Sequence, residues 1–230
     1  MTKLNKIAIA VDSEPDGDLL RDLVHSYGED PVLITPDTIR HTNYGTGNIS
    51  GLIIANGTQD LSQNVNSSAL MGDVISRLLP TVLDFDLPVL AVGSGIHTLN
   101  VTMGGRSARP IPAHGPLESG KSEHHHIFIT PGSRLASLVG AGGLVRVNSR
   151  HLLGIKHAQK APNLLACAYG LDDGVIEAVE SPSHTFVIGI QFQPERPREV
   201  PPHFERLFEA LVDHAAVSYT HLTLPTNREV

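Results

Sequence analysis

The 230-residue sequence contains no tryptophan, and aromatic residues make up 4% of it. Proteins that bind single-stranded nucleic acid stack bases on aromatic rings, so this composition disfavours such a role. Basic residues are also outnumbered, with 17 Lys and Arg against 24 Asp and Glu, and the formal net charge is −7. A surplus of negative charge disfavours nucleic acid and anionic membrane surfaces. We therefore expect neither nucleic acid nor a membrane as a partner.

Cysteine is also scarce, because Cys167 is the single one in the chain. No internal disulfide can form, which fits a reducing compartment. No run approaches the roughly 20 apolar residues of a membrane span, and the apolar stretch near the N-terminus is too short for a signal peptide. We expect a cytoplasmic protein. Cys167 lies in the apolar segment LLACAYG, where we interpret it as a buried structural thiol.

The first half of the sequence alternates short apolar segments with helical patterns. The helical patterns cover 18–27 and 68–83, and we expect Pro80 to break the second. The strand candidates are 6–11, 31–35, 51–55 and 88–92. Apolar strands that alternate with helices predict a mostly parallel sheet covered by helices on both faces. With 40% hydrophobic residues, the chain can fill the core of one α/β domain.

The second half has a different pattern. Residues 106–125 are rich in Gly, Pro, Ser and His and predict a long loop, and 203–217 predicts a closing helix. Five short strand candidates lie between them, at 127–130, 144–148, 164–169, 175–179 and 185–191. The turn signal Asp172-Asp173-Gly174 predicts a hairpin. We therefore expect a small antiparallel extension of the parallel sheet.

The last residues form a distinct segment. Residues 218–230, SYTHLTLPTNREV, show no periodicity that continues the preceding helix, and they resemble a translated adapter or vector sequence. We therefore expect one domain over 1–217 and a non-native tail over 218–230, with the native C-terminus missing.

The segment PVLAVGSGIHTLNVTMGG, residues 88–105, resembles a nucleophile elbow that has lost its nucleophile. An apolar strand is followed by Gly93-Ser94-Gly95, and then by a helical pattern that ends at two glycines. A strand that turns sharply into a helix holds one side chain at the turn, beside backbone N–H groups that can bind an anion. Enzymes with this geometry place Cys or Ser at the turn, where this chain has Gly93.

Two further segments complete a pattern that spans much of the chain. They are VNSRHLLGI at 147–155 and the pair DDGVIEAVE and FVIGIQFQPE within 172–195. Together with the elbow they resemble class I glutamine amidotransferase-like proteins, and most of all the γ-glutamyl hydrolase branch that includes γ-glutamyl-γ-aminobutyrate hydrolases. That branch carries G-[IV]-C-R-G-x-Q, V-N-S-x-H-H-Q, D-G-x-I-E-A and G-[VI]-Q-F-H-P-E. The resemblance implies a flavodoxin-like α/β fold.

The resemblance also implies a catalytic triad of Cys, His and Glu that hydrolyses amides through a thioester. In this sequence Gly93 stands at the Cys position, Gln193 at the His position and Glu195 at the Glu position, so only the last is retained. Glycine has no side chain to attack a carbonyl, and glutamine cannot take up and return a proton. The chain therefore lacks both the nucleophile and the base.

Other positions carry over in part. The resemblance implies that the backbone N–H groups of Gly57 and Ser94 form an oxyanion hole, and that His97, Ser149 and His151 lie near the substrate, with His97 in place of the family's Gln. We expect the pocket at the carboxyl ends of the parallel strands. Its expected lining is Gly57, Gly93, Ser94, His97, His151, Gln193 and Glu195.

Three functions remain open at this point. The first is a γ-glutamyl hydrolase-like protein without activity that binds a small γ-glutamyl or amino-acid-like ligand or a partner protein. The second is an active hydrolase that uses Ser94 or another nucleophile. The third is a non-catalytic subunit of a synthetase-like partner, and a homo-oligomer is also open.

The run His124-His125-His126 raises the question of a metal site, together with His114. Consecutive residues of an extended chain point to opposite faces, so three neighbouring histidines suit a single ion poorly. We therefore expect no metal and no cofactor.

Overall fold

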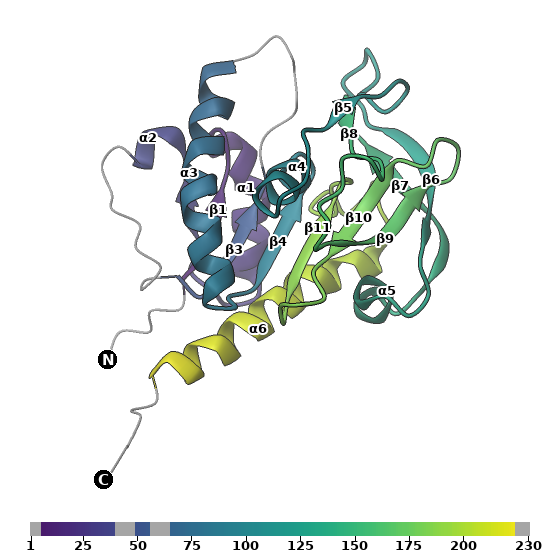
Figure 1. Cartoon of the computed structure of the whole chain (residues 1–230). Coiled ribbons are helices and arrows are strands. Elements are labelled where there is room, and N and C mark those ends of the chain that lie inside the picture. The colour runs from purple at the N-terminus through teal and green to yellow at the C-terminus, as the bar shows by residue number, and fades with distance from the viewer. Residues whose placement is uncertain (1–5, 40–48, 56–64, 224–230) are drawn as a thin grey trace.

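The computed structural model describes residues 6–39, 49–55 and 65–223. Its centre is a nine-stranded sheet in the order β2-β1-β3-β4-β11-β10-β9-β6-β7 (Figure 1). The first five of these strands are mutually parallel, and the other four are antiparallel to their neighbours. This confirms the predicted α/β class with a mostly parallel sheet and an antiparallel extension.

The parallel half consists of short strands whose residues are largely buried. Its bounds are β1 Ile7–Ala10, β2 Val32–Ile34, β3 Gly51–Ile54, β4 Val89–Val92 and β11 Val187–Ile190. Every residue of β1, β3, β4 and β11 is buried. Strands that are apolar on both faces require cover on both faces, which the helices provide.

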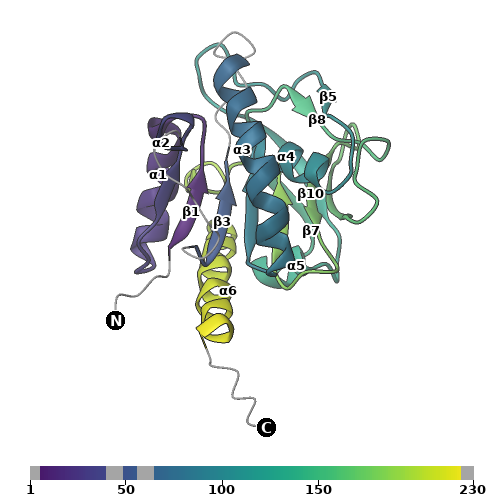
Figure 2. The same cartoon turned by 60° about the vertical axis from the view of Figure 1, so that its left-hand side comes forward.

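The helices cover the two faces of the sheet (Figure 2). α1 (Glu14–Ser26), α5 (Arg134–Val139) and α6 (Arg206–Thr223) contribute to one buried cluster. α3 (Val65–Asp84) and α4 (Gly95–Thr102) contribute to the other. The short α2 (Pro36–Ile39) follows β2, and a 3-10 turn at Pro202–Glu205 precedes α6. In the described part of the chain, none of these helices has the length and apolar character that crossing a bilayer requires.

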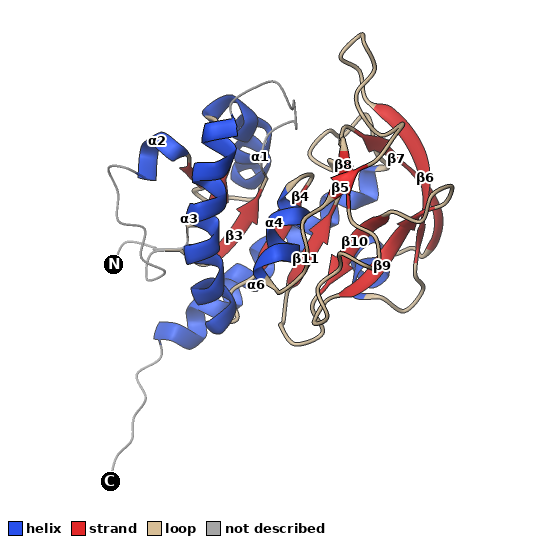
Figure 3. Ribbon diagram, turned by 45° about the horizontal axis from the view of Figure 1, so that its top comes forward, coloured by secondary structure: helices blue, strands red, loops and turns tan. Residues whose placement is uncertain are grey.

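The antiparallel half is continuous with the same sheet (Figure 3). Its strands are β6 Glu123–Ile129, β7 Gly143–Ser149, β9 Leu165–Gly170 and β10 Ile176–Glu180. β9 and β10 form the hairpin predicted at residues 172–174. A separate two-stranded pair joins β5 (Arg109–Pro110) to β8 (Leu153–Gly154). The predicted loop over 106–125 is therefore interrupted, because β5 lies within it and β6 begins at Glu123.

Two helix predictions were wrong in their bounds. α3 continues through Pro80 to Asp84. Leu79 and Val82 on either side are fully buried; burying two such side chains is worth about 3–6 kcal/mol, against about 3 kcal/mol for an internal proline.

α6 runs to Thr223, six residues beyond the predicted end at 217. The backbone is therefore helical over 218–223, and residues 224–230 lie outside the described residues. That the segment from 218 onward is non-native stays a prediction.

The antiparallel strands coil so that the far edge of the sheet returns toward its middle. Asn148 lies on the edge strand β7, yet its side chain bonds the backbone of Gln193, which follows β11 four strands away. In a flat sheet, strands spaced about 4.8 Å apart would separate these positions by about 19 Å. The coiling therefore brings the end of β7 to the carboxyl ends of the parallel strands.

The start of α4 packs tightly against β3 at Gly95. A Cβ added at this glycine would lie 2.0 Å from the carbonyl oxygen of Ile54, and backbone cannot move aside as a flexible side chain can. We expect Gly95→Ala to lower the free energy of unfolding by about 3 kcal/mol, measured by urea denaturation.

Gly72, inside α3, provides the matched control, because an added Cβ there meets nothing within 4 Å. Gly72→Ala should raise the stability by about 0.5–1 kcal/mol through helix propensity. Equal effects of the two substitutions would contradict the close approach at Gly95.

Candidate functional site

The predicted strand-to-helix turn is present at Gly93. This residue directly follows β4, is buried, and has a φ of +58°, in the left-handed region that glycine adopts without a side-chain penalty. Ser94 is the N-cap residue of α4. The turn therefore has the sharp backbone of a nucleophile elbow, with no side chain at its apex.

Position 193 faces this apex. β11 pairs with β4 in parallel, with Ile190 opposite Val92, so the chain segments that leave the two strands lie side by side. A Cβ added at Gly93 would lie 3.7 Å from Nε2 of Gln193 and 3.9 Å from its Cγ. The structure thus brings together the two positions that the resemblance assigns to nucleophile and base.

The segment that carries Gln193 is fixed by two partners. The Asn148 side chain, which is fully buried, accepts a hydrogen bond from the Gln193 N–H at 2.8 Å and donates one to the Gln193 carbonyl at 2.9 Å. Arg196 Nε donates to Gln193 Oε1 at 2.9 Å. The Gln193 side chain is therefore oriented with its amide nitrogen toward Gly93.

Glu195 carries a buried oxygen without a partner. Its Oε2 atom has no hydrogen bond within the described part of the chain. Burial raises the pKa of this carboxyl to about 7, because the charged form loses its hydration. A ligand with a positively charged or hydrogen-bonding group would stabilise this carboxylate.

His97 reaches the elbow through Gln191. Its Nε2 donates to Gln191 Oε1 at 2.9 Å, and Gln191 Nε2 donates to the Gly93 carbonyl at 3.4 Å. Burial lowers the pKa of His97 to about 4, so its imidazole is neutral near pH 7. Gln191 is a site residue that was not predicted from the sequence. It lies two residues before Gln193, and residues at this spacing in an extended chain share a face, which is the signal that could have found it.

Gly57, the other expected oxyanion residue, lies outside the described residues. Ser149 and His151 lie at the end of β7 and contact a different group of side chains. Ser149 Oγ donates to the His114 carbonyl at 2.8 Å, and His151 Nδ1 donates to the Leu153 carbonyl at 3.1 Å. Burial lowers the pKa of His151 to about 4.

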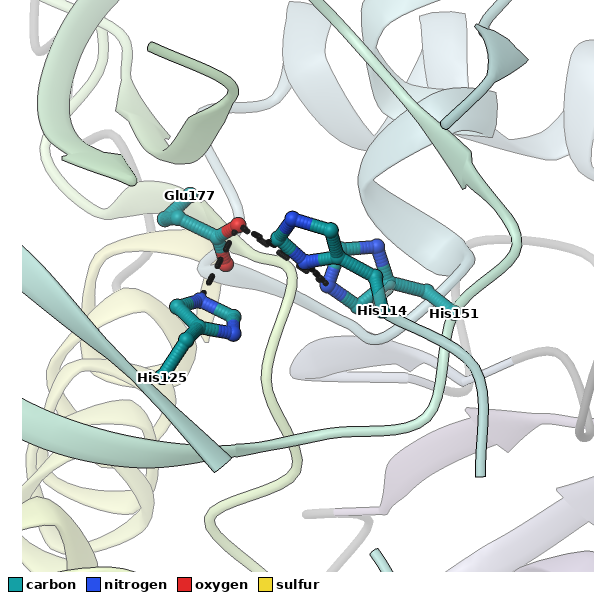
Figure 4. Close-up of side chains that lie close together, drawn as sticks. All are labelled: His114, His125, His151 and Glu177. Atoms are coloured by element: carbon teal, nitrogen blue, oxygen red, sulfur yellow. Dashed lines mark hydrogen bonds and ion pairs between the residues drawn. The ribbon is translucent and has the colours of Figure 1, made fainter. Parts of the chain in front are cut away.

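His151 belongs to a compact group with His114, His125 and Glu177, here called the histidine–glutamate cluster (Figure 4). Its ligand-type atoms all lie within 4.8 Å of one another. His125 points into the cluster while its neighbour His126 is exposed, as the alternating faces of a strand require. The other histidines of the cluster come from distant segments, which the spacing of the three consecutive histidines does not indicate.

The cluster and the elbow are neighbours through the backbone. Gln191 N–H donates to the carbonyl of Glu177 at 2.8 Å, so the strand that carries the cluster carboxylate is bonded to the residue that contacts His97. The site residues predicted from the sequence thus fall into two adjacent groups, one around Gly93 and Gln193 and one around His151.

The sequence is similar to a known protein family and to individual proteins. A family model described as Peptidase C26 matches residues 21–195. A Mycobacterium tuberculosis protein named as a glutamine amidotransferase is 33% identical over 144 residues, 60% of this chain and 44% of that protein. The γ-glutamyl-γ-aminobutyrate hydrolase of Escherichia coli O157:H7 is 28% identical over 135 residues, 54% of this chain and 52% of that protein. The chain thus matches about half the length of these two relatives.

Among solved structures, a Thermoplasma acidophilum protein described as a subunit of GMP synthase superposes with a TM-score of 0.68. The identity is 12%, and the superposition covers 96% of this chain and 98% of that one. This likeness confirms the fold.

The bond pair between Asn148 and Gln193 predicts a stability effect. Asn148→Ala would leave the Gln193 N–H and carbonyl without their partner, and each unsatisfied buried group costs about 1–3 kcal/mol. We expect the free energy of unfolding to fall by about 2–4 kcal/mol in urea denaturation. Asn163→Ala, at an exposed position, is the control and should change it little; a loss of the same size there would contradict the role of Asn148.

The pKa of Glu195 predicts a pH dependence. Because the folded-state pKa of about 7 lies above the ordinary value of 4.5 for a glutamate, the folded chain binds the proton more tightly than the unfolded chain. This carboxyl therefore destabilises the fold as the pH rises from about 4.5 to about 7. Glu195→Gln should remove that penalty, so its stability relative to the original chain should rise by up to about 3 kcal/mol between pH 4 and pH 8. A pH-independent difference between the two unfolding curves would contradict this assignment.

Proposed function

Since the chain belongs to the Peptidase C26 family of class I glutamine amidotransferase-like proteins, we propose that it is a γ-glutamyl hydrolase-like protein without hydrolase activity. In this proposal the site at the elbow binds a small γ-glutamyl or amino-acid-like ligand. The observation that supports it most strongly is the proximity of Gly93 and Gln193. A Cβ added at Gly93 would lie 3.7 Å from the side-chain nitrogen of Gln193. The elbow is shaped for a nucleophile and base, and neither residue can perform the chemistry.

The chemical consequence follows from the two side chains. Amide hydrolysis in this family, as the resemblance implies, requires a thiolate that attacks the carbonyl and an imidazole that carries the proton to the leaving amine. Removing a nucleophile or its base from such a triad typically costs on the order of 10⁶-fold in rate. With Gly93 and Gln193 both parts are missing, so turnover should fall to background.

Ser94 is a poor substitute for the missing nucleophile. The left-handed backbone that defines the elbow is at Gly93, whereas Ser94 has φ −67° and ψ −14° as it enters α4. Its side chain therefore leaves the chain at a different place from that of an elbow residue. The imidazole on the same helix, His97, is hydrogen-bonded to Gln191, and its pKa is lowered to about 4. It is therefore a weak base whose Nε2–H already has a partner.

The ligand chemistry follows from the groups that remain. Glu195 offers a buried carboxylate oxygen without a hydrogen-bond partner in the described chain, which suits the α-amino group of an amino acid. The start of α4 favours a negative charge, such as a ligand carboxylate, through its N-terminal backbone N–H groups. Together they favour a zwitterionic ligand of amino-acid type.

A second candidate is a non-catalytic subunit of a synthetase-like partner. The observation that favours it is the near-complete superposition on the Thermoplasma acidophilum GMP synthase subunit. Purification with a synthetase-like chain, and no binding of free γ-glutamyl compounds, would support this candidate over the first.

The direct test is hydrolysis of γ-glutamyl-p-nitroanilide. We expect the chain to release p-nitroaniline no faster than buffer. Clear turnover that Ser94→Ala abolishes would overturn the proposal in favour of a serine hydrolase.

A gain-of-function pair tests the geometry of the elbow. In Gly93→Cys with Gln193→His, the imidazole should lower the thiol pKa, so iodoacetamide should alkylate residue 93 about tenfold faster than in Gly93→Cys alone. The original chain is the blank, because its one thiol, Cys167, is buried and burial raises its pKa well above the usual range. Equal alkylation rates in the single and double variants would show that positions 93 and 193 do not face each other.

A further inference from the structure

We propose that the histidine–glutamate cluster is a metal site, in which His114, His125, His151 and Glu177 hold one divalent first-row transition-metal ion, Zn²⁺ foremost. The four residues come from four separate segments: the loop before β6, β6 itself, the segment after β7, and β10. The inference is independent of the proposed function, because it concerns different side chains and a different ligand.

The separations of the candidate ligand atoms match a tetrahedral ion. With Zn–N and Zn–O bonds of 2.0–2.2 Å, ligand atoms stand about 3.4 Å apart. Here His125 Nε2 lies 3.3 Å from Glu177 Oε1, and His114 Nδ1 lies 3.3 Å from His151 Nε2. His151 Nε2 and His114 Nδ1 lie 3.8 and 4.0 Å from Glu177 Oε1. The remaining separations, from His125 to the other two histidines, are no more than 4.8 Å, and no hydrogen bond to the described residues holds the His125 ring.

The outer hydrogen bonds of two histidines point their other ring nitrogens inward. His114 Nε2 donates to Asp173 Oδ2 at 3.1 Å, and His151 Nδ1 donates to the Leu153 carbonyl at 3.1 Å. With its outer N–H held in this way, each ring presents its other nitrogen to the cluster. Metal-binding histidines are held in this way, with the outer N–H bonded to a carboxylate or a backbone carbonyl.

The inner nitrogens of the two rings, His114 Nδ1 and His151 Nε2, lie 3.3 Å apart, a contact that Figure 4 marks with a dashed line. Ser149 Oγ lies 3.3 Å from the same His114 nitrogen and donates to the His114 carbonyl. A metal ion between the rings would be bound by both inner nitrogens, while Asp173 and the Leu153 carbonyl hold the outer N–H groups.

The Glu177 carboxylate offers the ion a fourth ligand. Its side chain is fully buried, and neither oxygen accepts a hydrogen bond from the described residues, although Oε1 lies at ion-pair distance from the three histidines. Buried carboxylates are paired or coordinate metals, since an isolated one loses its hydration without compensation. An ion coordinated by Glu177 would satisfy the carboxylate and the three imidazoles together.

The donor set defines the class of ion. Imidazole and carboxylate ligands favour Zn²⁺ and its first-row neighbours over Mg²⁺ and Ca²⁺, which prefer oxygen alone. Four protein ligands in a buried setting complete a tetrahedron, which is typical of structural rather than catalytic zinc sites. The ion would cross-link the loop that carries His114 to three segments of the antiparallel half of the sheet.

The test uses Co²⁺ as a spectroscopic probe on the full chain, produced without a histidine tag and stripped with a chelator. We expect one Co²⁺ per chain with the visible absorption of a tetrahedral site, displacement of that absorption by Zn²⁺, and a higher melting temperature with Zn²⁺ than without it. Glu177→Gln should weaken Co²⁺ binding by tenfold or more, because even the loss of an outer-shell partner costs about 10- to 100-fold.

His126→Gln is the matched control, since this histidine is the exposed neighbour of His125 on the same strand. It should bind Co²⁺ like the original chain. Asp173→Asn keeps all four ligands and should weaken Co²⁺ binding about tenfold. This variant provides a second test in case Glu177→Gln does not fold. The proposal would be overturned if the chain bound no Co²⁺, or if the Glu177→Gln and His126→Gln variants bound it equally well. The positive charge in the cluster would then be a proton shared between His125 and Glu177.

Discussion

The two hydrogen bonds between the Asn148 side chain and the Gln193 backbone are the contact on which the rest of the site depends. They join the edge strand β7 to the segment after β11, across the three intervening strands β6, β9 and β10. A buried amide that serves both an N–H and a carbonyl fixes position as well as distance, because both bonds fail if the segment shifts. The contact that joins the two ends of the coiled sheet therefore also fixes the backbone of Gln193 beside Gly93.

The same coiling creates the histidine–glutamate cluster. His125 and Glu177 lie on β6 and β10, which are separated by β9, so a flat sheet would hold their backbones about 10 Å apart. Their side chains meet at 3.3 Å. The elbow and the cluster are thus built by one curvature, and the bond from Gln191 to the Glu177 carbonyl connects them.

The sequence predicted what depends on local pattern. The parallel strands, the β9–β10 hairpin and the turn at Gly93 follow from apolar runs and from glycine positions. Positions 93 and 193, which the resemblance assigns to one triad, lie close together in the structure. The helix through Pro80 was not predictable in this way, because the burial of Leu79 and Val82 is a tertiary term. The cluster was missed for a similar reason: its four residues are spread over 64 positions, and only the coiling of the sheet brings them together.

Both groups contain a buried carboxylate oxygen that accepts no hydrogen bond from the described chain, on Glu195 and on Glu177. Such oxygens are costly to the folded state, as the pKa of about 7 for Glu195 shows. At Gly93, by contrast, the elbow has its least strained residue, since glycine accepts a φ of +58° freely. A site that served only to stabilise the fold would be more stable without these two carboxylates. At the elbow the chain already has the residue that strains the backbone least. The presence of the carboxylates supports the two proposals made for this chain: an amino-acid-type ligand beside Glu195, bound without hydrolysis, and a metal ion beside Glu177.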